Sequence, residues 1–274
     1  MVRRSQFVPW KAAGRVSERQ SDADDVVRTT GWVFNNETGQ QLTLESFVAT
    51  GDEEVGSYLH TFGLDGDDAA GKDLVEIGSG IGRMTCAFTK RFRCVTACDL
   101  DAGFLERCRE SVARFGRPKS LRTLEVADGR TIRLPDNSAD VAFSFITLQH
   151  CRRDHALALT TEAVRVVRSG GRIALNYRRR SPIDAVLVPV GSVVRTVFKI
   201  PGIGTTMSRH RSMTRLAWQA NRLAPHDLVV AVGCALRDVE VWHNPHRAID
   251  GAGATTRTMA GVNPSHWWLV ATVA

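Results

Sequence analysis

The chain has 274 residues, of which 43% are hydrophobic, and it carries a formal net charge of +7. This length and composition allow a substantial buried core, in one large domain or in two small ones. No stretch approaches the roughly 20 uninterrupted apolar residues of a membrane-spanning helix. The first sixteen residues also lack the apolar core and cleavage site of a signal peptide. We therefore expect a cytoplasmic protein.

The six cysteines form no Cys-x-x-Cys pair and show no zinc-finger spacing with histidine. Reduced, mostly buried thiols are expected, and no metal ligand is assigned.

Residues 1–50 are polar and show no sustained hydrophobic period, which is typical of an N-terminal extension or cap rather than of a domain. Residues 51–274 are expected to form the main domain. Its first predicted element is a helix over 52–64, whose apolar face comprises Val55, Tyr58, Leu59 and Phe62.

Short apolar runs then alternate with helical segments. Strands are predicted at 74–77, 93–98, 121–126, 140–146 and 172–177, and helices at 82–91, 101–115 and 154–168. Continuous apolar runs are typical of parallel strands covered on both faces, so the alternation predicts an α/β fold with a doubly wound sheet. Past residue 177 the alternation stops. A lid-like insertion over 178–211 precedes a predicted helix at 213–223 and predicted strands at 228–242 and 266–274.

The stretch "LVEIGSGIGRMT" (74–85) joins a strand to a helix through three glycines. Such a turn lets a ligand approach the backbone and directs helix N-terminal N–H groups toward it. A phosphate-binding loop would need a lysine before a hydroxyl residue, which is absent here. A dinucleotide site would use Gly-x-Gly-x-x-Gly, whereas the spacing here is Gly-x-Gly-x-Gly, preceded by Glu76. A carboxylate at this place suits a ligand with an ammonium group and would repel a pyrophosphate.

This stretch resembles the first motif of the class I S-adenosylmethionine-dependent methyltransferases. Three later blocks continue the resemblance in order: "CVTACDLD" (94–101), "LEVADGRTIRLPDNSADVAFSFITLQHC" (124–151) and "EAVRVVRSGGRIALNY" (162–177), where Ser169 replaces the usual proline. It covers roughly residues 52–177 and the two terminal strands. It implies a seven-stranded, Rossmann-like methyltransferase sheet with an antiparallel last strand.

The resemblance also implies that S-adenosyl-L-methionine is the cofactor. Asp99 would accept hydrogen bonds from the ribose hydroxyls, and Asp128 would hold the adenine amine beside the Gly129 backbone. The implied cofactor-binding residues are Glu76, Gly78, Ser79, Gly80, Gly82, Asp99, Leu100, Asp128, Gly129 and Thr147.

Methyl transfer to a hydroxyl needs alignment of the reactants and a base. His150 follows the fourth strand and is one candidate, with a packing role at the cofactor edge as the alternative. Tyr177 at the end of strand five is the other candidate, with burial and a satisfied hydroxyl as its alternative.

The sequence shows no Asn/Asp-Pro-Pro-aromatic loop for a flipped base, so nucleic-acid acceptors are disfavoured. Elimination favours O-methylation of a small molecule, sugar or lipid. A nucleic-acid enzyme of unfamiliar type, and a cofactor-binding protein without turnover, remain as alternatives.

Positive charge is concentrated in residues 178–222, which contain nine Lys or Arg and one acid, Asp184. The local net charge of +8 means that the rest of the chain is about neutral. A solvated basic face is one interpretation. The other is a cationic, partly apolar cover that recruits an anionic acceptor or rests on an anionic membrane surface.

Overall fold

The computed structural model describes residues 43–197, 203–207 and 221–274, together with residues 23, 27, 200 and 216. Helix α3 (Leu44–Thr61) begins after a capping box, in which Thr43 and Ser46 bond each other's backbone N–H groups. The predicted helix over 52–64 is thus the second half of a longer helix, and the expected boundary after residue 50 falls inside it. Residues 1–42 lie outside the described part except for 23 and 27, so their role stays a prediction.

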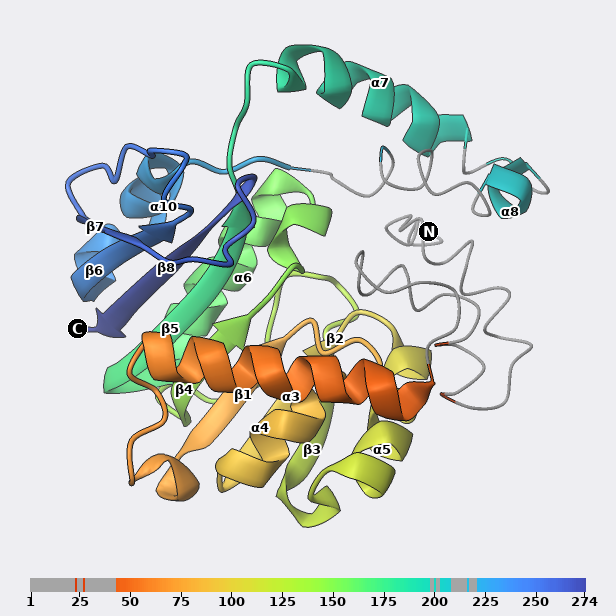
Figure 1. Ribbon diagram of the computed structural model, residues 1–274, viewed down its shortest axis with the longest axis vertical. Coiled ribbons are helices and arrows are strands. Elements are labelled where there is room, and N and C mark those ends of the chain that lie inside the picture. The colour runs from red at the N-terminus through yellow and green to blue at the C-terminus, as the bar shows by residue number, and fades with distance from the viewer. Residues whose placement is uncertain are drawn as a thin grey trace.

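A single eight-stranded sheet forms the centre of the domain (Figure 1). Its spatial order is β3-β2-β1-β4-β5-β8-β6-β7. The first five strands run parallel, and β8 is antiparallel to both of its neighbours. The strands are β1 (Asp73–Ile77), β2 (Cys94–Asp99), β3 (Leu121–Glu125), β4 (Ala139–Ser144), β5 (Val167–Arg178), β6 (Leu236–His243), β7 (Thr255–Thr258) and β8 (His266–Val273).

The predicted doubly wound sheet with an antiparallel last strand is confirmed, but the described sheet has one strand more than predicted. The addition is β7, an exposed four-residue edge strand beside β6. Its sequence, Thr-Thr-Arg-Thr, contains no apolar residue that would indicate a buried strand.

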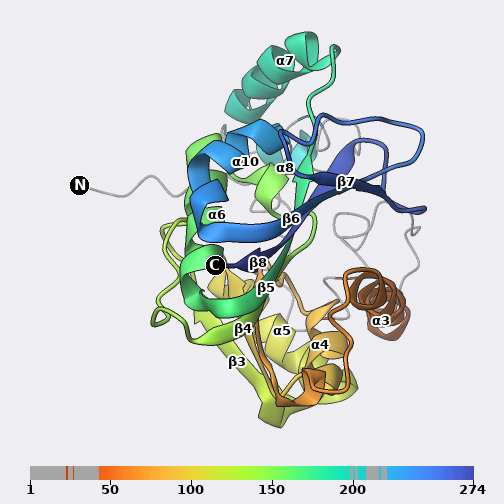
Figure 2. The ribbon, with the colours of Figure 1, turned by 90° about the vertical axis from the view of Figure 1, so that its left-hand side faces the viewer.

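Helices cover both faces of the sheet (Figures 1 and 2). Helices α3, α4 (Thr85–Arg91) and α5 (Ala102–Phe115) pack on one face, and α6 (Arg153–Val166) and α10 (Pro225–Val232) pack on the other. Two adjacent tryptophans of β8 enter opposite cores, Trp267 on the α6 side and Trp268 on the α3 side. Short 3₁₀ turns are η1 (Ala69–Gly71), η2 (Pro118–Ser120), η3 (Leu148–His150) and η4 (Gly233–Ala235).

The predicted strand over 228–242 is wrong in its first half, because residues up to Val232 belong to α10. Pro225 occupies the first turn of this helix, and the Asp227 carboxylate accepts a hydrogen bond from the Ala224 N–H. Leu228 and Val232 are buried in the core that contains α6. A short apolar run fits a buried helix as well as a strand, so hydrophobicity alone did not separate the two.

The predicted insertion begins at the last residue of β5 and contains α7 (Asp184–Val197) and α8 (Ile203–Met207). Figure 1 shows α7 beyond the sheet, past the end of β5. Most of the predicted helix at 213–223 lies outside the described residues, and residues 221–223 are not helical. Within the described residues, no helix has the length and apolar character needed to cross a bilayer.

Candidate functional site

The glycine turn after β1 adopts a backbone that favours glycine at three positions. Gly78, Gly80 and Gly82 have φ angles of +83°, +54° and +93°. A Cβ atom on Gly78 would lie 2.1 Å from the Thr147 side chain, and one on Gly82 would lie 3.1 Å from the Cys108 sulfur of α5. Gly78 therefore keeps the turn close to the loop after β4, while Gly82 lets α5 pack against the turn.

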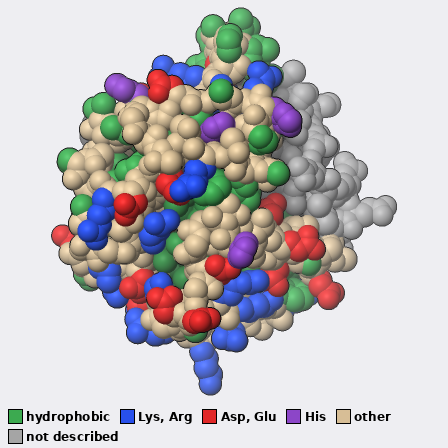
Figure 3. Space-filling view, turned by 60° about the vertical axis from the view of Figure 1, so that its left-hand side comes forward, with side chains coloured by type: hydrophobic (Ala, Val, Ile, Leu, Met, Phe, Trp, Pro, Cys, Tyr) green, Lys and Arg blue, Asp and Glu red, His purple; other side chains and the backbone are tan. Residues whose placement is uncertain are grey.

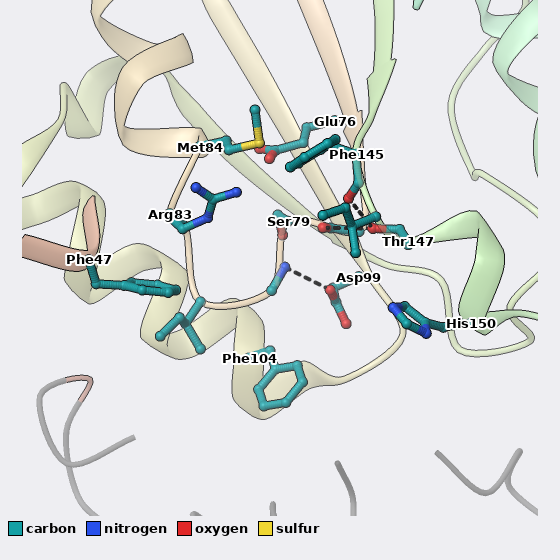
Figure 4. A pocket seen from close by; sticks show the side chains of 14 residues that line it. Phe47, Glu76, Ser79, Arg83, Met84, Asp99, Phe104, Phe145, Thr147 and His150 are labelled. Atoms are coloured by element: carbon teal, nitrogen blue, oxygen red, sulfur yellow. Dashed lines mark hydrogen bonds between the residues drawn. The ribbon is translucent and has the colours of Figure 1, made fainter. Parts of the chain in front are cut away.

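A cleft opens at the carboxyl ends of β1, β2 and β4, where open α/β sheets bind ligands. It has two adjoining parts, with empty volumes of about 830 and 560 Å³ including space open to solvent. Gly78, Asp99, Thr147 and His150 line both parts. Figure 4 shows how the side chains of the first part converge on the glycine turn.

Asp99, the last residue of β2, is bound by the chain around it. One carboxylate oxygen accepts a hydrogen bond from the Gly80 N–H at 2.9 Å, and the other accepts from the Asp101 N–H at 3.0 Å. Burial raises the pKa of Asp99 to about 6, although both hydrogen bonds act to lower it. The carboxylate is thus held in a fixed position beside the turn.

Glu76 lies on β1 and is only 4% exposed. Its carboxylate accepts a hydrogen bond from the Thr85 hydroxyl at 2.6 Å. Burial raises the pKa of Glu76 to about 7, against the lowering effects of Thr85 and of the nearby Arg83. An ammonium group in the cleft would therefore favour the charged form of this side chain.

Arg83 also lines the cleft, and sequence reasoning missed it. Its guanidinium donates to the Glu54 carboxylate of α3 at 2.8 Å and lies 5.9 Å from the centre of the Phe145 ring. Its place directly after the third glycine is the one signal in the sequence that could have indicated it. Six more residues that line the same part were also missed: Phe47, Ile81, Met84, Phe104, Phe145 and Ile146.

The second part of the cleft has an apolar wall that includes Leu100, Val126, Cys151 and Leu159, with Gly129 beside them. Asp128 is exposed and is not among the residues that line either part. Its carboxylate accepts hydrogen bonds from the Arg130 and Thr131 N–H groups, each at 2.9 Å. The Asp128 side chain thus stabilises the turn formed by residues 128–131. The structure brings the Gly129 backbone to the cleft, but not the Asp128 carboxylate.

The two candidate bases lie in different places. His150 lines both parts of the cleft. Tyr177 is 1% exposed, its hydroxyl lies 2.7 Å from the Thr160 hydroxyl of α6, and its ring stacks on Trp267. Tyr177 lines neither part of the cleft. The catalytic assignment of Tyr177 is therefore corrected to its alternative, a buried tyrosine with a satisfied hydroxyl.

Of the ten residues expected to bind the cofactor, eight line the cleft, and Gly82 and Asp128 do not. The donor set fits the cofactor that the resemblance implies. The buried hydroxyl of Ser79 has no hydrogen-bond partner within the described part of the chain. The carboxylates of the buried Glu76 and the partly buried Asp99 suit an ammonium group and a pair of hydroxyls, and the apolar wall suits a planar ring.

Comparisons with known proteins point in the same direction. Residues 75–175 match the family model described as a methyltransferase domain. The chain is 27% identical to phosphoethanolamine N-methyltransferase 1 of Caenorhabditis elegans over 111 residues, which are 40% of this chain and 22% of that protein. It is 31% identical to an S-adenosyl-L-methionine-dependent Diels-Alderase of Talaromyces variabilis over 115 residues, 41% of this chain and 38% of that protein. The match thus spans well under half of either relative.

Two solved structures resemble nearly the whole chain. A SAM-dependent methyltransferase from Aquifex aeolicus is 15% identical with a TM-score of 0.52, covering 98% of this chain and 100% of that one. Magnesium protoporphyrin IX methyltransferase from Synechocystis PCC 6803, with bound SAH, is 14% identical with a TM-score of 0.53, covering 92% and 98%. At identities this low, the similarity shows a shared fold and nothing more specific.

Proposed function

We propose that the chain transfers a methyl group from S-adenosylmethionine to a small-molecule acceptor, because residues 75–175 match the methyltransferase-domain family model and the fold is similar to that of solved methyltransferases. One observation carries the proposal. The buried carboxylate of Glu76 and the partly buried carboxylate of Asp99 flank a glycine turn at the carboxyl edge of the sheet, in a cleft that the same turn lines.

The chain's own groups would hold the cofactor at both ends. Glu76 would accept from the ammonium group, and Asp99 would accept from the ribose hydroxyls. Leu100 and the Gly129 backbone would lie along the adenine ring. When bound, S-adenosylmethionine supplies an electrophilic methyl group on a sulfonium. The protein's main task is then to align the acceptor with that methyl group.

We propose O-methylation, with His150 accepting the proton that the acceptor hydroxyl loses. The position of His150 between the two parts of the cleft supports this role. If it is the base, His150→Ala should lower kcat by about 10²- to 10⁴-fold and leave cofactor affinity nearly unchanged. If it packs against the cofactor, affinity should fall instead. His246→Ala, at an exposed histidine outside the cleft lining, is the matched control.

The decisive experiment incubates the purified chain with methyl-labelled S-adenosylmethionine and a fractionated metabolite extract. Release of S-adenosylhomocysteine together with a labelled small molecule supports the proposal, and the product identifies the methylated atom. Release that occurs only with added RNA or DNA would move the acceptor to nucleic acid.

A second function is favoured by one observation, the similarity to a Diels-Alderase that is described as S-adenosyl-L-methionine-dependent. By that analogy the chain would bind the cofactor and shape a cavity for a reaction without methyl transfer. Conversion of an extract component with no release of S-adenosylhomocysteine would select this alternative.

The acceptor is proposed to be anionic and, in one form of the proposal, lipid-linked. Helix α7 supports the lipid form, because Val186, Val190 and Val193 recur at helical spacing and are 64%, 42% and 65% exposed. Figure 3 shows hydrophobic side chains, with Lys and Arg beside them, at the end of the molecule where α7 lies in Figure 1. An apolar helix next to positive charge suits an anionic membrane surface.

A further inference from the structure

Arg178 is a half-buried cation that makes no hydrogen bond to an anionic group in the part of the chain that the structure describes. It is the last residue of β5, and no hydrogen bond or ion pair joins its guanidinium to any residue that the structure describes. Burial, followed by repulsion from Arg222, lowers the pKa of Arg178 to about 10. Because the guanidinium stays charged at neutral pH, its partly desolvated charge would be stabilised by an anion.

The acid whose charge acts on Arg178 is already bound. Asp184, at the start of α7, accepts a hydrogen bond from the buried Arg222 at 2.9 Å and another from the Ser181 N–H at 2.8 Å. Arg195 of α7 adds a third guanidinium, whose pKa is lowered by burial and then by Arg222. Asp184 acts electrostatically on Arg178 while its own two oxygens are bound by Arg222 and Ser181, so it makes no hydrogen bond to the Arg178 guanidinium.

This cluster is tied to the cleft through residues 221–223. The Asn221 side chain donates to the Leu148 and Cys151 carbonyls on either side of His150, at 2.6 and 2.8 Å. The next residue but one, Leu223, donates its N–H to the Arg178 carbonyl at 3.1 Å. The segment that carries Arg222 thus connects the turn carrying His150 to the end of β5.

Arg178 does not itself line the cleft, but the strand register places it next to residues that contact the turn after β4. Successive strand residues point to opposite faces, so Arg178 shares a face with Asn176 and not with Tyr177. The Asn176 side chain accepts a hydrogen bond from the N–H of Ile146, which lines the cleft. Across the β5–β8 pair, Arg178 faces His266, whose imidazole lies 2.6 Å from the Gln149 carboxamide oxygen. Burial, and then Arg178 and His150, lower the pKa of His266 to about 3, so it stays neutral.

The two following arginines have partners elsewhere. Arg179 donates to the Arg247 carbonyl at 3.2 Å, and Arg180 lies 3.8 Å from the Asp227 carboxylate. This difference separates Arg178 from the next two arginines.

We propose that Arg178 binds the anionic group, a phosphate or a carboxylate, of the molecule that enters the cleft beside His150. The proposal rests on the proposed function for the identity of that molecule as the methyl acceptor. A planar guanidinium can bond either anion through two parallel hydrogen bonds.

Titration calorimetry on the full chain tests this proposal, with S-adenosylhomocysteine present and inorganic phosphate or acetate as the probe. Sodium chloride holds the ionic strength constant. We expect the wild-type chain to bind one of the probes in the millimolar range and Arg178→Gln to weaken that binding about tenfold or more. Arg178→Lys should retain part of the affinity through its charge. Arg180→Gln removes an exposed neighbouring charge and should bind like the wild type.

Each outcome decides one proposal. Equal probe binding by wild type and Arg178→Gln, or no binding of either probe by the wild type, overturns the assignment of Arg178. Failure of the wild type to bind S-adenosylhomocysteine overturns the proposed function instead, and the probe titration still decides the anion site. Retained S-adenosylhomocysteine affinity in each variant shows that the variant is folded.

A vesicle experiment distinguishes the two sources of the anion. Sedimentation with phosphatidylcholine vesicles that contain phosphatidic acid, lost in Arg178→Gln, would assign the group to a lipid headgroup. Probe binding without sedimentation would assign it to a soluble acceptor.

Discussion

Asp99 is positioned by the backbone on both of its sides, because it accepts from Gly80 in the turn and from Asp101 before α5. A carboxylate fixed in this way loses little entropy when it binds hydroxyl donors. We expect Asp99→Ala to weaken S-adenosylmethionine binding by about 1.5–3 kcal/mol, roughly ten- to a hundredfold. Titration calorimetry measures this. Glu125→Ala, at the exposed acid opposite Asp99 on β3, should have little effect. Unchanged affinity in a folded Asp99→Ala variant would remove Asp99 from the cofactor site.

The raised pKa of Glu76 leads us to expect that cofactor affinity depends on pH. Its pKa of about 7 in the free protein means that below this pH the carboxyl carries a proton, which it must release to pair with an ammonium group. The dissociation constant of S-adenosylhomocysteine should therefore rise by up to about tenfold per pH unit as the pH falls below 7. Asp99, with a pKa of about 6, adds to the effect below pH 6. Calorimetry between about pH 5.5 and 8.5 covers the range.

The variant Glu76→Gln cannot titrate, so it should bind more weakly at pH 8 and lose the pH dependence between pH 6 and 7. Parallel pH profiles for the variant and the wild type would contradict this prediction.

At the scale of elements, the contact between α3 and the glycine turn shapes one end of the cleft. A Cβ atom on Gly51 of α3 would lie 2.2 Å from the Arg83 carbonyl oxygen, so Gly51→Ala must push the helix away. We expect this change to lower the free energy of unfolding by about 1–3 kcal/mol. It should also weaken cofactor binding, because Phe47 and the Glu54–Arg83 pair lie at the same contact.

Gly56→Ala on the same helix is the matched control. Its new Cβ would meet nothing closer than 3.9 Å, so the better helix propensity of alanine should raise stability by up to about 1 kcal/mol. Urea unfolding measures both variants. Equal stability of the two would show that the close approach at Gly51 does not matter.

At the scale of the whole molecule, the positive net charge lies in one segment, since residues 178–222 carry +8, the chain carries +7, and the rest is therefore about neutral. In the lipid form of the proposal, the chain should sediment with anionic vesicles and not with neutral ones. Salt should release it, because the Debye length is only ~8 Å at physiological ionic strength. Replacing Arg178, Arg179 and Arg180 with serine should weaken the binding and flatten its salt dependence.

The control makes the same change of charge on the opposite side of the cleft, at the exposed Arg109, Arg114 and Arg117 on and after α5. No sedimentation of the wild type would favour a soluble anionic acceptor. If the variant with serine at 178–180 sediments with anionic vesicles to the same extent as this control, the basic segment is a solvated face without a role in binding.

The sequence by itself determined the features that are encoded locally. Five apolar runs predicted the parallel strands, and three glycines after an acid predicted the turn that lines the cleft. These signals are reliable because backbone conformation and burial on both faces act on neighbouring residues. His150 could be placed near the cleft because it follows a strand end, and strand ends of a parallel sheet meet at one edge.

Only the tertiary structure decided the features that depend on residues far apart in the chain. The run at 228–232 became helix α10 because it packs on α6, and Tyr177 faces Thr160 rather than the cleft. Arg83 is oriented by Glu54 on a helix 29 residues earlier. Arg178 differs from the next two arginines through what surrounds it. The acid that acts on it, Asp184, is bound to Arg222, which is 38 residues from that acid. Hydrophobic period and spacing report on local conformation, whereas the partner of a charged side chain is set by the packing of distant elements.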